Sequence, residues 1–428
     1  MTIWKLNDAL SLSFGLDALG LFFLVLVTFI FAFVLSYASV YMKHEGGQRQ
    51  FYLFYGLTWL FLVLLAMAKN AATLYMCFEM MSLCSMPLVL HNGQEASRSA
   101  AFKYIGYSTL GASLALFGFF LFAQVSPGME FVPGGVTIPE NLKTAALAAY
   151  LLIFLGFGAK AGLVPLQMWL TEAHPVAPSP ASAVLSGLIT KGGVFAILRC
   201  TFFLFGADAV AGTKVQTVLI ILTLITIFTG SMLALREKLL KKRLAYSTVS
   251  QVSYVLFGVL TFTTAGFSGA MLQFVFHALA KDALFLAAGG MIFATGLTHT
   301  YELRGIGRRM PVTLWCFTIG ALSLVGIPPT GGFIAKWYLA LGALEGGTAL
   351  GIVGVAVLMV SALLTAFYLL PIMADGFFPG KDWVPERKCE LPMRMLLPMG
   401  FFAALLVVLG MYSGGLYNWF TALAGTLM

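Results

Sequence analysis

The chain has 428 residues, of which 60% are hydrophobic and only 10% are charged. This low charge excludes an ordinary soluble domain, which needs more charged residues to cover its surface. The formal net charge is +8, but the basic residues lie in short stretches between apolar segments, where they set membrane topology. We therefore expect a lipid bilayer around the chain and no nucleic-acid partner.

Apolar stretches long enough to cross a bilayer as helices, about 18 residues or more, recur along the chain, and alternating barrel strands do not. They predict one all-α integral membrane domain over residues 1–428, with about twelve transmembrane helices. The first stretch is too long for the apolar part of a cleavable signal peptide, so we expect none. The expected spans are 12–42, 50–68, 70–90, 98–124, 143–168, 181–206, 214–235, 244–263, 268–296, 312–345, 348–376 and 396–425.

Neither the cysteines nor any motif indicates a metal or a cofactor. The five cysteines show no CxxC spacing and no histidine cluster, which predicts free packing residues and no metal site. No nucleotide-binding, haem or iron–sulfur pattern is present. We expect no cofactor and no catalytic redox residue in this chain, so any redox chemistry would take place in partner subunits.

The basic residues between the spans predict the orientation. With the N-terminus outside, sixteen Lys and Arg fall on the cytoplasmic side, five fall on the outer side and four lysines fall within spans. This bias predicts both termini on the outer side of the cytoplasmic (inner) membrane of a prokaryote. The sixteen are Lys43, Arg49, Arg98, Lys103, Arg236, Lys238, Lys241, Lys242, Arg243, Arg304, Arg308, Arg309, Lys381, Arg387, Lys388 and Arg394, and the five are Lys5, Lys69, Lys143, Arg199 and Lys214.

Two inverted five-helix repeats are expected between the terminal helices. After the N-terminal helix at 12–42, five spans fill residues 50–206 and five more fill 214–376, before the C-terminal helix at 396–425. An odd number of spans in each set inverts the second set relative to the first.

The fourth span of each repeat is predicted to be broken. Glycines and prolines interrupt both, around Pro165 in GFGAKAGLVPLQ and around Pro328 and Pro329 in GIPPTGGFIAKW. Paired interrupted helices favour a transport site, whereas glycines that merely allow close packing are the alternative. A lysine beside each break, Lys160 and Lys336, favours the transport site.

Five ionisable side chains lie within apolar spans: Glu79, Lys160, Lys191, Lys281 and Lys336. Each lysine costs roughly 2.5–3.5 kcal/mol at the bilayer centre, so these side chains should face the bundle interior or water. Desolvation favours the neutral form of a lysine and a nearby carboxylate favours the charged form. A buried Lys–Glu pair can thus change protonation when a neighbouring charge moves, which predicts a proton path.

His277 and Lys281 are four residues apart and share one helical face. Histidine can pass a proton through its two ring nitrogens near neutral pH, so this pair favours a relay over a simple packing histidine. Asp282 points to another face, where it would only neutralise charge locally.

Other charged residues receive simpler interpretations. Glu172 and His174 lie in the Pro-rich turn TEAHPVAPSP, where a proton-access site and an ordinary loop hydrogen bond fit equally. Asp17 is interpreted as a helix cap, and Arg199 as a side chain that reaches toward the interface. The stretch REKLLKKR at 236–243 is interpreted as a solvated inner flank.

These residues resemble those of the antiporter-like proton-pumping subunits of respiratory complex I, of Mrp-type cation/proton antiporters and of membrane-bound hydrogenases. The resemblance runs from residue 14 to about residue 400. It is carried by FEMMSLCSMPLVL around Glu79, the block KAGLVPLQMWLTEAHPVAPSPASAVLSGLITKGGVFAILR from Lys160 to Arg199, LKKRLAYSTVSQVSY at 240–254, HALAKDALFLAAGG at 277–290, GIPPTGGFIAKWYL at 326–339 and CELPMRMLLPM at 389–399.

The resemblance implies a proton path through six side chains and other membrane subunits as partners, further antiporter-like subunits among them. In path order the six are Glu79 and Lys160 (the pair of the first half-channel), Lys191 (the connection to the centre), His277 and Lys281 (the central relay) and Lys336 (the terminal residue). The chain departs from the family by lacking its first two helices and by carrying Gln167 where histidine is frequent. A proton would pass Gln167 through water, or access would shift toward His174.

Three functions stay open at this point. The first is a proton-translocating subunit of a redox-driven complex, either complex I-like or membrane-bound hydrogenase-like. The second is a subunit of an Mrp-type cation/proton antiporter, and the third is a non-conducting scaffold. The filled ionisable positions disfavour the scaffold, and the residues do not separate the first two.

Overall fold

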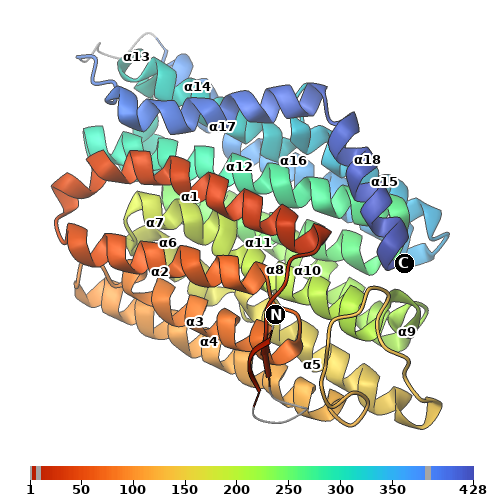
Figure 1. Ribbon diagram of the computed structural model, residues 1–428. Helices are drawn as coiled ribbons and strands as arrows, with labels where there is room; N and C mark the ends of the chain where they lie inside the picture. Colours follow the sequence, from red (N-terminus) through yellow and green to blue (C-terminus); the bar gives the residue numbers. More distant parts are fainter. Residues whose placement is uncertain (1, 6–10, 381–386) are drawn as a thin grey trace.

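The computed structural model describes residues 2–5, 11–380 and 387–428; Lys381, which we place in a cytoplasmic loop, lies outside them. The described chain is a bundle of long helices (Figure 1) with one antiparallel hairpin, β1 (Thr2–Lys5) and β2 (Ser11–Ser13). The α-helices are α1 (Ala18–Glu45), α2 (Gln48–Ala66), α3 (Ala71–Val89), α4 (Glu95–Phe122), α5 (Lys143–Ala161), α6 (Met168–Val176), α7 (Ser179–Val184), α8 (Thr190–Arg199), α9 (Ala207–Val210), α10 (Lys214–Arg236), α11 (Leu240–Leu260), α12 (Thr264–Thr295), α13 (Ile306–Arg309), α14 (Pro311–Val325), α15 (Gly331–Glu345), α16 (Ala349–Phe377), α17 (Met393–Met411) and α18 (Gly414–Leu427). Two 3-10 turns, η1 (Glu140–Leu142) and η4 (Thr300–Leu303), and two π-helical turns, η2 (Leu185–Ile189) and η3 (Cys200–Phe205), complete the helical elements.

Each expected span coincides with a helix or a run of consecutive helices. Among the described residues, ten helices are long and apolar enough to cross a membrane, so the chain is a multi-span integral membrane protein. The two remaining spans are α11 and the α14–α15 pair. Helix α11 carries Lys241, Lys242 and Arg243 in its first turn, and most of its remaining residues are buried among other helices, so its composition is not set by contact with lipid.

The first span begins later than expected, at Ala18 instead of residue 12. The Asp17 carboxylate accepts a hydrogen bond from the Gly20 N–H at 2.8 Å and caps the helix. Strand β2 ends at Ser13 and so occupies the first two residues that we expected to be helical. Asp17 is therefore the helix cap that we predicted.

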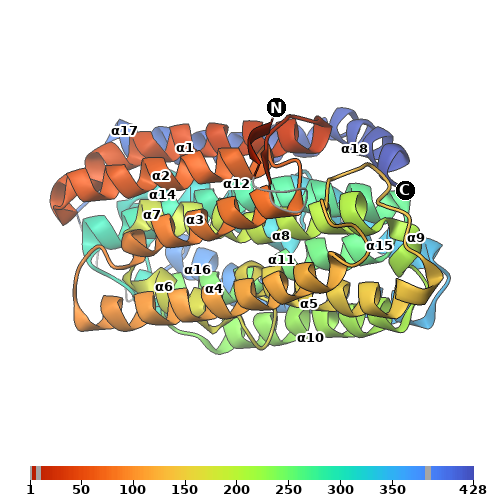
Figure 2. The same ribbon diagram turned by 60° about the horizontal axis from the view of Figure 1, so that its bottom comes forward.

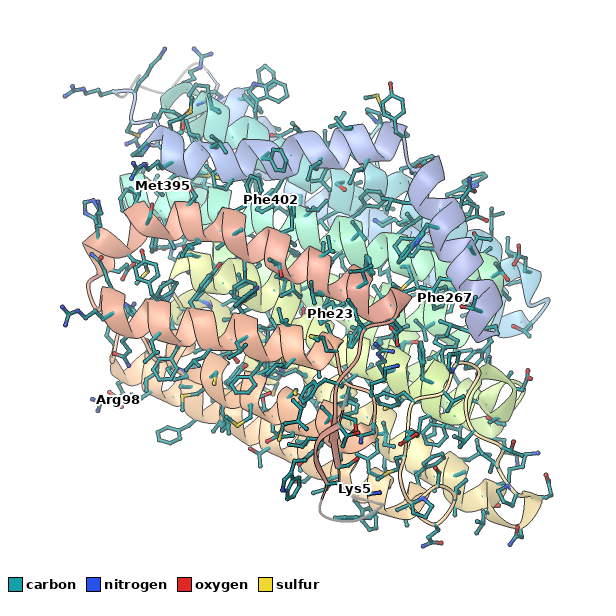
Figure 3. All side chains as sticks on the ribbon, in the orientation of Figure 1. Lys5, Phe23, Arg98, Phe267, Met395 and Phe402 are labelled. Atoms are coloured by element: carbon teal, nitrogen blue, oxygen red, sulfur yellow. The ribbon has the colours of Figure 1, made fainter. Side chains whose placement is uncertain are left out.

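The last span is two helices, so the single helix expected over 396–425 is wrong. Helix α17 ends at Met411 and α18 begins at Gly414. Adjacent Gly414 and Gly415 have low helix propensity, which favours an interruption there. Figure 1 shows α17 beside α1 and α18 turning away from it. The Phe33 and Phe401 rings stack between these helices with centroids 4.4 Å apart, and Phe402 packs on the same face (Figure 3).

Both predicted helix breaks are confirmed. Helix α5 ends at Ala161 and α6 starts at Met168, whereas α14 ends at Val325 and α15 starts at Gly331. Each first half ends on a glycine in the left-handed region, Gly162 with φ 89° and Gly326 with φ 91°, which is the usual way to stop a helix. The inverted relation between the two sets of helices stays a prediction.

The centre of the bundle is a stretch of helix without lipid contact. The run Ser179–Phe205, made of α7, η2, α8 and η3, is fully buried, and α12 is buried over most of its length. Figure 2 shows α8 and α11 between a layer containing α1 and α2 and a layer containing α5 and α10. Exposed charges such as Arg98 project from the ends of the helices (Figure 3). The buried centre is where ionisable groups are shielded from lipid.

Candidate proton path

Lys160 lies at the end of α5, just before the first break, and is 1% exposed. Its Nζ donates hydrogen bonds to the Tyr104 hydroxyl at 2.6 Å and to the Ser108 hydroxyl at 3.0 Å. The Tyr104 hydroxyl in turn shares a hydrogen bond with Ser85 of α3. Two neutral hydroxyl groups of α4 therefore hold this ammonium group, and Ser85 of α3 contacts one of them.

Glu79 lies near Lys160 but is not its hydrogen-bond partner. The two charges attract each other, and Glu79 also interacts electrostatically with Tyr104. Glu79 Oε1 is buried and meets no hydrogen-bond partner among the described residues. Tyr104 thus contacts Lys160 and lies near Glu79, and the sequence analysis missed it. Its only signal in the sequence is a polar hydroxyl group within an apolar span.

Lys191 lies on the fully buried α8 and contacts the π-helical turn η2. Its Nζ donates to the Ser186 carbonyl at 2.7 Å, an oxygen that also accepts from the Thr190 hydroxyl at 2.8 Å. The carboxylate of Asp282, on α12, interacts electrostatically with Lys191. Lys191 thus lies beside η2, the turn that packs against α12.

His277 and Lys281 share a face of α12, as their spacing predicts. Lys281 Nζ donates to the Leu244 carbonyl at 2.8 Å and to the Ser247 hydroxyl, both on α11. His277 is 1% exposed, and neither of its ring nitrogens has a hydrogen-bond partner within the described part of the chain. It lies within electrostatic range of Lys191, Lys281 and Lys336. His277 therefore sits among three of the predicted path lysines.

Lys336 lies on α15, just after the second break. Its Nζ donates to the carbonyls of Leu324 and Val325, the latter at 2.8 Å. These carbonyls end α14, where a helix has no internal donors for its last oxygens and its dipole attracts a cation. The break thus creates the binding site for the ammonium group.

Two glutamines connect the centre to Lys336. Gln273, one turn before His277 on α12, donates to Gln251 Oε1 at 2.8 Å, and Gln251 donates to the Leu324 carbonyl at 3.5 Å. The same carbonyl binds Lys336. The sequence analysis missed both glutamines, although amide side chains within apolar spans were a usable signal.

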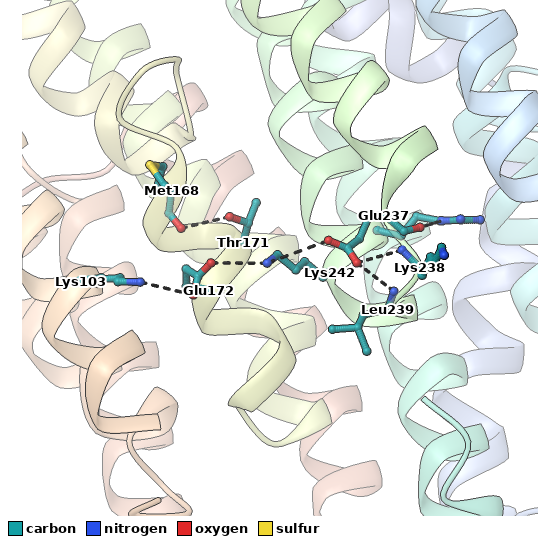
Figure 4. A network of polar contacts seen from close by, with 9 residues as sticks. Lys103, Met168, Thr171, Glu172, Glu237, Lys238, Leu239 and Lys242 are labelled. Atoms are coloured by element: carbon teal, nitrogen blue, oxygen red, sulfur yellow. Dashed lines mark hydrogen bonds and ion pairs between the residues drawn. The ribbon is translucent and has the colours of Figure 1, made fainter. Parts of the chain in front are cut away.

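Glu172 and His174 lie in different environments, although only one residue stands between them in the sequence. Glu172 is part of a surface network in which Lys103 and Lys242 each approach it at 3.5 Å, and Lys242 also reaches Glu237 (Figure 4). Lys242 is 25% exposed at its side chain. The stretch 236–243 is therefore not simply the solvated flank that we expected.

His174 instead points into the protein. It is 0% exposed, stacks on Phe285 with ring centroids 4.6 Å apart and interacts electrostatically with Lys191, Lys241 and Lys281. The chain just after it, Pro175–Ala177, lines a cavity of about 230 Å³. Glu45 and Lys241 line the same cavity, and Lys241 Nζ donates to the Ala177 carbonyl at 2.7 Å.

Arg199 does not reach toward the interface, so that expectation is wrong. The residue is 0% exposed. Its guanidinium donates to both carboxylate oxygens of Asp17 and to the Ala66 carbonyl at 3.2 Å. The Phe203 ring lies on its face, 4.7 Å from the guanidinium carbon. Arg199 therefore links α8 to the start of α1.

Comparison with known proteins places these residues in a family. The family model described as "NADH:quinone oxidoreductase/Mrp antiporter, TM" matches residues 68–365, and "NADH-Ubiquinone oxidoreductase (complex I), chain 5 N-terminus" matches residues 5–52. The first match includes every candidate path residue.

Individual proteins agree with the family match. The chain is 32% identical over 413 residues to NADH-quinone oxidoreductase subunit N of Desulforudis audaxviator, covering 93% of this chain and 81% of that protein. It is 31% identical over 429 residues to hydrogenase-4 component B of Escherichia coli, covering 94% of this chain but only 62% of that longer protein. A chain of the Mrp complex from Dietzia sp. DQ12-45-1b has the same fold, with a TM-score of 0.87 at 23% identity over 99% of this chain and 86% of that one.

Proposed function

The chain belongs to the NADH:quinone oxidoreductase/Mrp antiporter family of membrane subunits, and from this we propose that it is a proton-translocating, antiporter-like subunit of a redox-driven membrane complex. In this proposal the path runs through Glu79, Lys160, Lys191, the His277/Lys281 pair and Lys336, listed here in order. The chain itself would hold no cofactor, and electrons would move in partner subunits.

One observation carries the proposal: the four intramembrane lysines all donate to neutral oxygens. Hydroxyls hold Lys160, carbonyls hold Lys191 and Lys336, and one of each holds Lys281. Among the described residues, none of these ammonium groups forms a direct ion pair. A lysine on a neutral oxygen can give up its proton without leaving a directly bound carboxylate unpaired in the interior. A scaffold would gain nothing from such an arrangement.

The surroundings of the path complete the proposal. We place the chain in the inner membrane of a prokaryote with both termini outside, because of the excess of basic residues in the loops that this orientation puts inside. Access from the cytoplasmic side would lead through the cavity lined by Glu45 and Lys241 to His174. The chain would work with other membrane subunits, as its similarity to chains of the Mrp complex and of respiratory complex I supports. An Mrp-type antiporter subunit would use the same residues, so the identity of co-purifying subunits separates the two functions.

The test is proton uptake by proteoliposomes that contain the assembled complex. Glu79→Gln preserves shape but removes the charge that favours protonated Lys160, and Lys336→Ala removes the opposite end of the path. Each should lower coupled transport by about 100-fold while assembly persists, which is the lower end of the range for a positioned proton-transfer group. Lys238→Ala, an exposed lysine, is the control. A wild-type transport rate in Glu79→Gln would show that the buried charges are structural.

A further inference from the structure

Asp282 carries a buried carboxylate that no hydrogen bond within the described residues stabilises. It is 0% exposed, and both of its oxygens lack a hydrogen-bond partner among the residues that the structure describes. A charged group is expensive to bury within a membrane domain unless it is paired or serves a function. The sequence indicated only local charge neutralisation for this residue.

The carboxylate is aimed at one particular turn of the neighbouring helix. A Cβ atom at position 187 would lie 2.3 and 2.7 Å from the two oxygens of Asp282. Only glycine leaves room for a carboxylate at this distance. Gly187 lies in η2, a π-helical turn, and such turns are frequent at functional sites.

Lys191 contacts the same turn. Its Nζ is 2.7 Å from the carbonyl of Ser186, the residue before Gly187. Lys191, on α8, and Asp282, on α12, thus both approach the turn η2. Their charges attract each other. No hydrogen bond joins the two side chains in the described structure. The arrangement parallels that of Glu79 and Lys160, which also attract without direct contact.

We propose that Asp282 is the proton-exchanging partner of Lys191, so that the path contains a second lysine–carboxylate pair at its centre. This inference rests on the proposed proton translocation. In the exchange one N–H bond of the Lys191 ammonium breaks and one O–H bond forms on Asp282, directly or through a water. A charged pair becomes a neutral pair, and the net charge is unchanged. The neutral pair is the form that the dry interior tolerates best, and Asp282 can then return the proton to Lys191 or pass it toward His277.

The experiment compares Asp282→Asn with Asp208→Asn, which alters an exposed aspartate on α9. Proton uptake by proteoliposomes of the assembled complex should fall by about tenfold in Asp282→Asn and stay unchanged in Asp208→Asn. Infrared difference spectra of the working complex should also lose the C=O band of a protonated carboxyl group. Wild-type transport and an unchanged band in Asp282→Asn would overturn the proposal.

A second variant keeps every charge. Gly187→Ala places a methyl group where the carboxylate lies, and it should lower transport by several-fold by moving Asp282 away. If Asp282→Asn does not assemble, a wild-type rate in Gly187→Ala overturns the proposal by itself. Glu79→Gln separates the two levels of inference. If Glu79→Gln loses transport while the Asp282 and Gly187 variants keep it, only the proposed Lys191–Asp282 pair is refuted. Full transport in Glu79→Gln would instead refute the proposed proton translocation itself.

Discussion

Arg199 and Lys191 lie on the same fully buried stretch, Ser179–Phe205, yet their partners differ in kind. Arg199 donates to both oxygens of Asp17, whereas Lys191 donates to the Ser186 carbonyl. A guanidinium stays protonated, and a bidentate carboxylate fixes its position. An ammonium group on a neutral oxygen can exchange its proton. Burial alone therefore does not identify a relay residue, and the chemical nature of the partner separates structural from exchanging cations.

The largest effect is expected for Lys191→Met. Methionine keeps most of the side-chain volume but cannot carry a proton, so proton uptake by the assembled complex should fall by about 100-fold or more. The matched control is Lys238→Met at an exposed position. Measurement in proteoliposomes after the subunit composition has been verified distinguishes lost transport from lost assembly. A rate near that of the wild type would place Lys191 with Arg199 among the structural cations.

Asp17→Asn tests the other side of the comparison. It leaves the buried charge of Arg199 without its carboxylate, so the free energy of unfolding should fall by about 3–5 kcal/mol. Protein that does assemble should transport protons at close to the wild-type rate. Thermal unfolding in detergent measures the first effect and proteoliposome uptake the second.

Glu140→Gln is the control for that experiment. Glu140 pairs with Lys143 at 3.4 Å on the surface, where its side chain is 86% exposed. An exposed pair of this kind contributes about 1 kcal/mol at most. Equal unfolding temperatures for Asp17→Asn and Glu140→Gln would contradict the structural role of the Asp17–Arg199 pair.

A smaller loss is expected for Tyr104→Phe. This change removes one hydroxyl partner of Lys160 and the link to Ser85 but leaves Ser108 in place. A hydrogen bond to a charged group is worth about 1.5–3 kcal/mol, part of which the remaining hydroxyl can supply, so transport should fall by about fivefold. Tyr412→Phe, at a 75% exposed position, is the control. An unchanged rate would show that Ser108 alone positions Lys160.

The helices and their breaks were predictable because local composition controls them. Long apolar runs indicate the spans, and clustered glycine and proline interrupted α5–α6 and α14–α15 where expected. The break between α17 and α18 was missed, since its signal is only the pair Gly414–Gly415. The sequence likewise indicated which lysines are buried, because apolar residues flank them.

The partners of those lysines were not predictable from one sequence. Lys160 is held by Tyr104, 56 residues away, and Arg199 by Asp17, 182 residues away. Such contacts depend on how distant helices pack, which apolar periodicity does not specify. That is why Arg199 was expected to extend toward the interface, and why Asp282 was expected to do no more than neutralise charge nearby.

The smallest effect is expected for Glu172→Gln. Glu172 is partly exposed and its contacts with Lys103 and Lys242 are both 3.5 Å long, so removing its charge should change stability by less than about 1 kcal/mol and leave transport nearly unchanged. His174→Gln, only two residues away, alters a fully buried ring within electrostatic range of Lys191 and Lys281 and should slow proton uptake by several-fold. Initial rates in proteoliposomes compare the two directly. A larger loss in Glu172→Gln than in His174→Gln would mean that protons reach the path from the surface network in Figure 4 and not through the cavity beside His174.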